Sequence, residues 1–149
     1  AGFIGTNLIK RLLNDGHKVV SLDNYTTGKK ENEQKGCQYF DVDLVQTDNY
    51  DFFMDKPDVI YHLAAIARIQ PSFEHPTYTF HSNVTATLNV LEWARGKECP
   101  VVYAGSSSSN GDKFANPYTL SKSQSEQLVE LYNKVYDLPT TTCRFYIYT

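Results

Sequence analysis

The chain has 149 residues, of which 41% are hydrophobic and 13% aromatic, and this composition fits a globular α/β protein and excludes a disordered segment. Its formal net charge of -3 offers no basic surface, so we expect no nucleic-acid partner. No apolar run approaches the length of a membrane span and no signal-peptide pattern is present. We therefore expect a cytoplasmic protein without a membrane partner.

Hydrophobic periodicity predicts strands and helices in regular alternation along the chain. The predicted strands cover residues 19–22, 38–42, 58–63, 101–104 and 141–145, and the predicted helices cover residues 4–13, 48–54, 77–95 and 118–136. Loops are predicted over residues 24–36, around Pro71 and Pro76, and over residues 105–116. Within the last helix we expect four side chains to face the core: Leu128, Leu131, Tyr132 and Val135.

This alternation predicts an α/β fold, a doubly wound parallel sheet of the Rossmann type with helices on both faces. No linker or repeat divides the chain, so we expect one domain over residues 1–149. The cysteines lack a C-x-x-C pattern and indicate reduced thiols. The histidines do not cluster at metal-ligand spacing, so we predict that no metal is bound.

The chain opens on Ala1-Gly2-Phe3-Ile4-Gly5, which has the spacing of the second half of a dinucleotide-binding glycine fingerprint. Gly2 would let the backbone approach a pyrophosphate, and Gly5 would let the following helix pack closely on the sheet. An ordinary strand-to-helix turn is the alternative. On the fingerprint interpretation, we expect the first strand to lie before Ala1, and the substrate domain to lie after Thr149.

Asp23 stands at the end of the predicted strand 19–22, roughly 20 residues after the glycines, where an acid binds the adenosine ribose in such folds. A carboxylate accepts two ribose hydroxyls and repels a 2′-phosphate, and no arginine follows directly. The position therefore favours NAD over NADP. The alternative is a turn aspartate after a strand.

Tyr118 and Lys122 are one helical turn apart on one face of the predicted helix. A free tyrosine, with a pKa of about 10, is a poor base at neutral pH. An ammonium about 4 Å from the phenolate would stabilise it by roughly 4 kcal/mol at an effective dielectric near 20, which would make Tyr118 able to take a proton from a sugar hydroxyl. The same spacing occurs in Tyr25 and Lys29, which flank a loop glycine. For Tyr118 and Lys122, the alternative is an exposed tyrosine beside a solvated lysine.

A serine run, Ser106-Ser107-Ser108-Ser109, follows the predicted strand 101–104, at the sheet edge where ligands bind in parallel α/β folds. A hydroxyl there could bind the substrate oxygen and share its proton with Tyr118. Ordinary loop composition is the alternative. The order of strand end, serine and Tyr118 helix favours function.

Together these motifs resemble the NAD-dependent epimerase/dehydratase family, a group of extended short-chain dehydrogenases/reductases that modify nucleotide sugars. The resemblance covers the whole chain and is carried by Ala1-Gly2-Phe3-Ile4-Gly5, Leu22-Asp23-Asn24, Asp41-Val42, His62-Leu63-Ala64-Ala65, Asn83-Val84-Thr85-Ala86-Thr87, Ser106-Ser107-Ser108, Tyr118-Thr119-Leu120-Ser121-Lys122 and Arg144-Phe145-Tyr146.

The resemblance implies roles for individual residues. Ser106, Tyr118 and Lys122 would be catalytic, and Ser106, Ser107 and Tyr118 would contact a nucleotide-sugar substrate. The implied NAD-binding residues are Gly2, Phe3, Ile4, Gly5, Asp23, Asn24, Asp41, Val42, Leu63, Ala64, Ala65, Asn83, Tyr118, Lys122 and Phe145. It also implies a homodimer of the intact protein, formed by the helices 77–95 and 118–136.

The chain departs from the family pattern at several positions. Ser107 and Ser108 stand where dehydratases carry an Asp-Glu pair, which favours an epimerase acting at the sugar C4. Asn110 replaces a tyrosine, and Ile147 replaces an asparagine that helps bind the nucleotide-sugar phosphate. The alternatives are a dehydratase, decarboxylase or reductase of the same family, or a catalytically idle dinucleotide-binding module.

Overall fold

The computed structural model describes residues 1–146, which belong to two compact units. The first unit is Ala1–Asp55 and the second begins at Lys56. The prediction of one domain over the whole chain stays a prediction.

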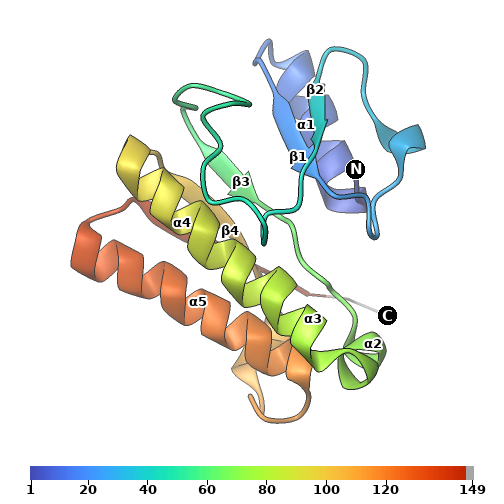
Figure 1. The fold of residues 1–149 in the computed structure, drawn as a ribbon, viewed down its shortest axis with the longest axis vertical. Helices are drawn as coiled ribbons and strands as arrows, with labels where there is room; N and C mark the ends of the chain where they lie inside the picture. The colour runs from blue at the N-terminus through green and yellow to red at the C-terminus, as the bar shows by residue number, and fades with distance from the viewer. Residues whose placement is uncertain (147–149) are drawn as a thin grey trace. The chain divides into compact units, whose positions relative to one another are not determined.

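The first unit contains one helix, a short 3₁₀ turn and a two-stranded parallel sheet (Figure 1). These are α1 (Phe3–Asn14), β1 (Val20–Asp23), η1 (Lys30–Asn32) and β2 (Gln38–Asp41). β1 and β2 pair in a register that sets Asp23 opposite Asp41 at their carboxyl ends. The helix ends at Asn14 with Asp15 as its C-cap, and Gly16 follows with φ +85°, a conformation that favours glycine. The helix predicted over residues 4–13 is confirmed.

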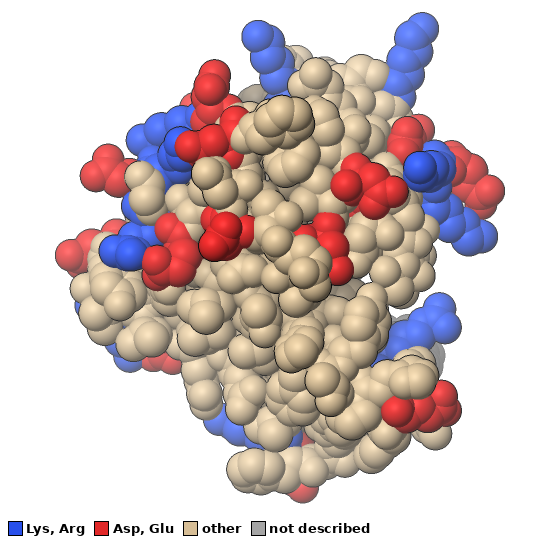
Figure 2. Space-filling view, in the orientation of Figure 1, with Lys and Arg blue, Asp and Glu red and all other residues tan. Residues whose placement is uncertain are grey.

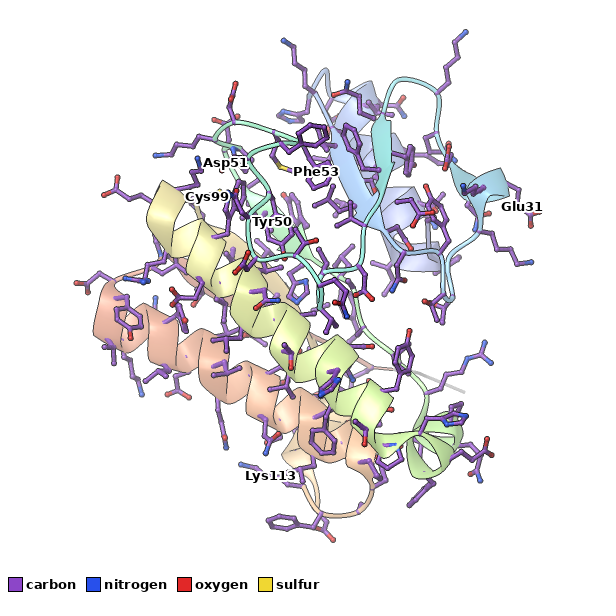
Figure 3. The ribbon with its side chains drawn as sticks, viewed as in Figure 1. Glu31, Tyr50, Asp51, Phe53, Cys99 and Lys113 are labelled. Carbon is purple, nitrogen blue, oxygen red and sulfur yellow. The ribbon has the colours of Figure 1, made fainter. Side chains whose placement is uncertain are left out.

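The weak helix predicted over residues 48–54 is wrong, because this segment forms turns. Asp43 Oδ1 accepts the Val45 N–H and Asn49 Oδ1 accepts the Asp51 N–H, both at 2.9 Å. Side chains that bind nearby backbone N–H groups compete with helix formation. Figure 3 labels Tyr50, which is buried and directs its hydroxyl to the Thr47 carbonyl at 2.8 Å.

The second unit contains a three-stranded parallel sheet in the order β3-β4-β5, and its helices α4 and α5 lie side by side (Figure 1). Its elements are β3 (Ile60–His62), α2 (Ile69–Glu74), α3 (Pro76–Phe80), the π-helical turn η2 (His81–Thr85), α4 (Ala86–Lys97), β4 (Val101–Ser106), the 3₁₀ turn η3 (Ser107–Asn110), α5 (Pro117–Tyr136) and β5 (Thr140–Phe145).

Two predicted boundaries differ from the structure. The predicted loop around Pro71 contains α2, in which Pro71 is the third residue; a proline is tolerated in a first turn because its missing N–H would have no partner there. The single helix predicted over residues 77–95 is α3, η2 and α4, with a π-helical turn between two α-helical segments.

The core of the second unit lies between α4, α5 and the sheet. Its buried residues are Leu91, Ala94, Val101, Tyr103, Val129, Tyr132 and Leu138. The prediction for α5 is therefore correct for Tyr132 and in part for Leu128, which packs against this cluster. It is wrong for Leu131 and Val135, which are 46% and 59% exposed. The buried face of α5 carries Val129 and the small residues Ser121 and Ser125. Leu131 and Val135 therefore lie on a face of the helix that is exposed to solvent.

Both sheets are parallel, and the fold is α/β as predicted. The hydrogen-bonded ladders of the described residues form two sheets rather than one. The face drawn in Figure 2 carries Lys and Arg side chains at separate places among acidic ones. Among residues 1–146, no helix is long and apolar enough to cross a membrane.

Candidate active site

Ser106 and Tyr118 meet at the carboxyl end of β4. Ser106 is the last residue of β4, and Tyr118 is the second residue of α5. The Tyr118 hydroxyl donates to Ser106 Oγ at 3.3 Å. Ser106 Oγ also lies 2.8 Å from Ser108 Oγ and accepts the Ser108 N–H at 3.3 Å. The serine and tyrosine singled out in the sequence are thus within hydrogen-bonding distance.

Lys122 is buried one turn after Tyr118 on α5. Its Nζ donates to the Ala104 carbonyl at 2.6 Å and lies 4.4 Å from the centre of the Tyr103 ring. Burial lowers the pKa of Lys122 to about 8, although the negative charge of Glu126 acts in the opposite direction. A lysine with this pKa is charged at neutral pH and can lose its proton a little above it.

The segment before α5 fixes where Tyr118 stands. Asn116 Oδ1 caps the helix by accepting the Thr119 N–H at 2.8 Å, and Pro117 occupies the first helical position. The Tyr118 N–H donates to Ser72 Oγ of α2 at 3.1 Å. The preceding loop, residues 111–116, carries Lys113 (Figure 3). Sequence reasoning missed Ser72, because its partner lies 46 positions away.

Asn83 joins the loop after β3 to α5. Its Oδ1 accepts the Ile66 N–H at 2.8 Å, while its Nδ2 donates to the Ile66 carbonyl at 3.2 Å and to Ser121 Oγ at 2.9 Å. Its backbone carbonyl accepts from Ser125 Oγ at 2.9 Å. Asn83 lies in the π-helical turn η2 and is fully buried. Its hydrogen bonds therefore hold the loop after β3, at Ile66, against α5.

His62, the last residue of β3, is buried and neutral. Thr87 Oγ1 donates to the Asn83 carbonyl at 2.6 Å, so it can accept from His62 Nε2 at 2.9 Å. Burial, and then the positive charge of Lys122, lowers the pKa of His62 to about 3. The imidazole therefore serves as a hydrogen-bond donor in the interior.

Several residues expected to line the cofactor lie at the carboxyl edge of the three-stranded sheet. Leu63, Ala64 and Ala65 follow β3 directly, and Phe145 ends β5 opposite Ser106. Leu63 and Ala65 are half-buried, while Ala64 and Phe145 are exposed. This edge is where parallel α/β sheets bind ligands.

In the first unit, the start of α1 leaves its N-terminus open. Gly2 is the N-cap, is exposed, and provides no side chain to cap the helix. A Cβ on Gly2 would meet no protein atom within 4 Å, so the space beside the helix start is open. Phe3 and Ile4 are exposed, and Gly5 is half-buried. Uncapped N–H groups at a helix N-terminus suit a phosphate, so these residues fit a pyrophosphate.

The other residues predicted to hold the cofactor in this unit lie at the carboxyl ends of β1 and β2. Asp23 Oδ1 accepts the Tyr25 N–H and Oδ2 accepts from the Ala1 backbone nitrogen, both at 2.8 Å. Asn24 is exposed, and Asp41 is exposed opposite Asp23. Val42 is buried. The two acids fit ribose hydroxyls, which hydrogen-bond to carboxylates.

Tyr25, the tyrosine of the second Y-x-x-x-K pattern, has different surroundings. Its hydroxyl donates to Glu33 at 2.5 Å, and Lys29 pairs with Glu31 at 3.4 Å. Burial and the charge of Glu33 raise the pKa of Tyr25 above its ordinary value. The structure gives this pattern no activated tyrosine.

The cysteines Cys37, Cys99 and Cys143 are free thiols. Within the described part of the chain, no group of three or more His, Cys, Asp or Glu side chains could hold a metal ion. Ile147, at which the sequence departs from the family pattern, lies outside the described residues.

The Ser-Tyr-Lys set at the sheet edge of the second unit, and the uncapped glycine-led helix of the first unit, each fit a dinucleotide-dependent protein of the short-chain dehydrogenase type. The NAD dependent epimerase/dehydratase family model matches residues 1–147. The chain belongs to this family, and its cofactor is NAD.

Protein CapI of Staphylococcus aureus is 33% identical over 98% of this chain and 51% of its own length. UDP-glucuronic acid decarboxylase 3 of Arabidopsis thaliana is 36% identical over 78% of this chain and 34% of its own length. Among solved structures, the UDP-glucose 4-epimerase of Thermus thermophilus in complex with NAD is 30% identical, with a TM-score of 0.85. That match covers 97% of this chain and 52% of the epimerase chain. The chain therefore spans about half the length of CapI and of this epimerase.

Proposed function

We propose that the intact protein is a nucleotide-sugar epimerase that inverts the sugar C4 by reversible oxidation, with Tyr118 as the base. The observation that carries the proposal is the 3.3 Å contact between the Tyr118 hydroxyl and Ser106 Oγ at the carboxyl end of β4. The likeness to a UDP-glucose 4-epimerase supports the choice of reaction.

The roles of the chain's own residues follow from their contacts. Tyr118, as phenolate, takes the proton of the sugar 4-hydroxyl, and Ser106 Oγ hydrogen-bonds to the same oxygen. Lys122 is buried one helical turn after Tyr118, and its positive charge would stabilise the phenolate. NAD, when bound, supplies the reversible hydride acceptor. The 4-keto sugar then rotates so that the opposite face of C4 is turned toward the cofactor. When C4 is reduced from that face, Tyr118 returns the proton to the C4 oxygen.

Each unit of the chain has its own proposed NAD-binding residues. In the first unit, Gly2, Phe3, Ile4 and Gly5 would face the pyrophosphate, and the acids Asp23 and Asp41 with Asn24 and Val42 would face the adenosine. In the second unit the groups would be Leu63, Ala64, Ala65, Asn83, Tyr118, Lys122 and Phe145.

The intact protein would be a homodimer that pairs through α3–α4 and α5. Support comes from apolar side chains on the outer faces of these helices, since Leu88 of α4 and Leu131 and Val135 of α5 are exposed. Exposed apolar residues on neighbouring helices favour an interface.

A decarboxylase is the second candidate, because the chain is 36% identical to a UDP-glucuronic acid decarboxylase. Ser107 and Ser108 stand in η3, next to Ser106, and carry no carboxylate. The absence of a carboxylate at positions 107 and 108 favours an epimerase over a dehydratase, since dehydratases of this family carry acidic residues at these two positions.

The experiment is to supply the full-length protein with NAD and, separately, UDP-glucose, UDP-N-acetylglucosamine and UDP-glucuronic acid, and to identify the products by NMR. Inversion at C4 without release of carbon dioxide is the expected result. Release of carbon dioxide from UDP-glucuronic acid would establish the decarboxylase instead. No turnover of any of the three, with NAD bound, would favour the idle module.

A further inference from the structure

Glu126 connects three elements of the second unit through one carboxylate. It lies one helical turn after Lys122 on α5, and its side chain is 9% exposed. Oε1 accepts the Ser106 N–H at 3.0 Å. Oε2 accepts from Arg144 of β5, from Nε at 3.0 Å and from Nη2 at 2.8 Å. The two oxygens thus bind the end of β4 and the neighbouring strand separately.

The close approach of this carboxylate to β4 requires a glycine. A Cβ built on Gly105 would stand 2.7 Å from Glu126 Oε1 and 2.7 Å from Thr142 Cγ2. Real Cβ atoms do not come so close, so only a residue without a side chain lets the carboxylate reach the Ser106 N–H. Gly105 and Glu126 therefore form one arrangement that holds the peptide of Ser106.

The second effect of Glu126 is electrostatic. The groups that act on the Lys122 ammonium are neutral His62 of β3, the Tyr103 ring and the Ala104 carbonyl of β4, and Glu126 of α5. Glu126 is the group whose charge raises the pKa of Lys122, against the larger effect of burial. One side chain thus acts on both the serine and the lysine of the candidate site.

We propose that Glu126 is a positioning residue of the active site, which fixes the Ser106 backbone and places a negative charge one helical turn from Lys122. The proposal rests on the proposed function only where it assigns Ser106 and Lys122 a part in the reaction. Arg144 holds the second carboxylate oxygen and so keeps the first one directed at Ser106.

The test compares Glu126→Gln and Glu126→Ala with Glu130→Gln in the full-length protein. Glu130 is the matched control, because it lies one turn further on α5 in an exposed ion pair with Lys134. The titration of Lys122 is followed by NMR of carbon-13-labelled lysines, with its signal assigned from a Lys122→Arg spectrum. The exchange of the Ser106 amide proton is followed by hydrogen–deuterium exchange.

The proposal expects the Lys122 titration midpoint to fall by about one pH unit in both Glu126 variants and to stay in place in Glu130→Gln. Ser106 amide exchange should be faster in Glu126→Ala than in Glu126→Gln, whose amide oxygen can still accept the N–H. In the active enzyme, the alkaline limb of the kcat profile should move to lower pH, and Glu126→Ala should lose about tenfold to a hundredfold in kcat.

A Lys122 midpoint and a Ser106 exchange rate that match wild type in both Glu126 variants would overturn the proposal. A role confined to folding would lower the melting temperature and leave both readouts in place, which also overturns it. Neither readout needs substrate. If they change as expected while the wild-type protein turns over no nucleotide sugar, the proposed function fails and the positioning by Glu126 stands.

Discussion

Tyr118 and Tyr25 have the same spacing to a lysine, but their hydroxyls bind different partners. Tyr118 donates to the neutral Ser106 hydroxyl, whereas Tyr25 donates to the Glu33 carboxylate, which opposes loss of the phenolic proton. The spacing alone could not separate the two. Their places in the fold do, since one tyrosine begins a helix at a sheet edge and the other lies in a loop.

We predict that Tyr118→Phe lowers kcat by roughly 10²- to 10⁴-fold, the usual contribution of a general base. The change removes one hydroxyl and keeps the ring, so the Kd for NAD should barely change. Steady-state kinetics and calorimetry of the full-length protein measure both quantities. Tyr25→Phe is the control and should retain wild-type turnover. Equal losses in the two variants would show that the catalytic helix is wrongly assigned.

The buried His62 predicts how stability depends on pH. Its pKa is about 3 in the folded chain and about 6.5 when unfolded, so the unfolded chain binds more protons between these values. The stability that neutral His62 contributes is complete above pH 6.5 and is lost as pH falls toward 3, by about 1.4 kcal/mol per pH unit.

Urea unfolding at several pH values below 7 checks this, with His62→Gln and His81→Gln as the variants. Gln can still donate to Thr87 but does not titrate, so His62→Gln should show a shallower loss of stability on acidification. His81 is exposed, and its variant should follow wild type. A loss in His62→Gln as steep as in wild type would contradict the assignment.

At the scale of elements, the sequence predicts what depends on local pattern and misses what depends on distant partners. Capping rules account for the end of α1 before Asp15-Gly16 and for the start of α5 at Pro117, after its N-cap Asn116. Asn83 hydrogen-bonds to Ile66 and Ser121, which lie 17 and 38 positions away in the sequence. No local sequence pattern predicts these two hydrogen bonds. The helix predicted over residues 48–54 is wrong for a local reason, because Asn49 Oδ1 accepts the Asp51 N–H and stabilises a turn instead.

Asn83→Ala should destabilise the second unit by about 1–3 kcal/mol, because the half-buried Ile66 N–H loses its partner and the Asn83 side chain itself is fully buried. The α5 residue Ser121 loses a donor at the same time. Denaturant unfolding measures the change in the free energy of unfolding. Asn110→Ala is the control, since this exposed amide donates to the Tyr146 hydroxyl and its loss should cost less than about 0.5 kcal/mol. Similar costs for the two variants would mean that Asn83 does not join the β3 loop to α5.

At the scale of the whole molecule, the residues predicted to hold NAD are divided between the two units. The first unit offers an uncapped helix start and acids at strand ends, and the second offers the Ser-Tyr-Lys set at its own sheet edge. The family and the α/β class followed from the order of these motifs. The division into two sheets did not, because strand pairing is decided by backbone contacts that a residue pattern does not specify.

We predict that Asp23 makes the intact protein bind NAD in preference to NADP. Its carboxylate stands at the end of β1, opposite Asp41, where it can accept ribose hydroxyls and repel a 2′-phosphate. Asp23→Ala should weaken NAD binding by about 1–3 kcal/mol, the scale of lost hydrogen bonds to a charged group, and should weaken NADP binding less. Calorimetric titration of the full-length protein with each dinucleotide measures both. Asp15→Ala, at the far end of α1 in an exposed pair with Arg11, should change neither affinity. If wild type binds NADP as tightly as NAD, Asp23 does not set the choice of cofactor.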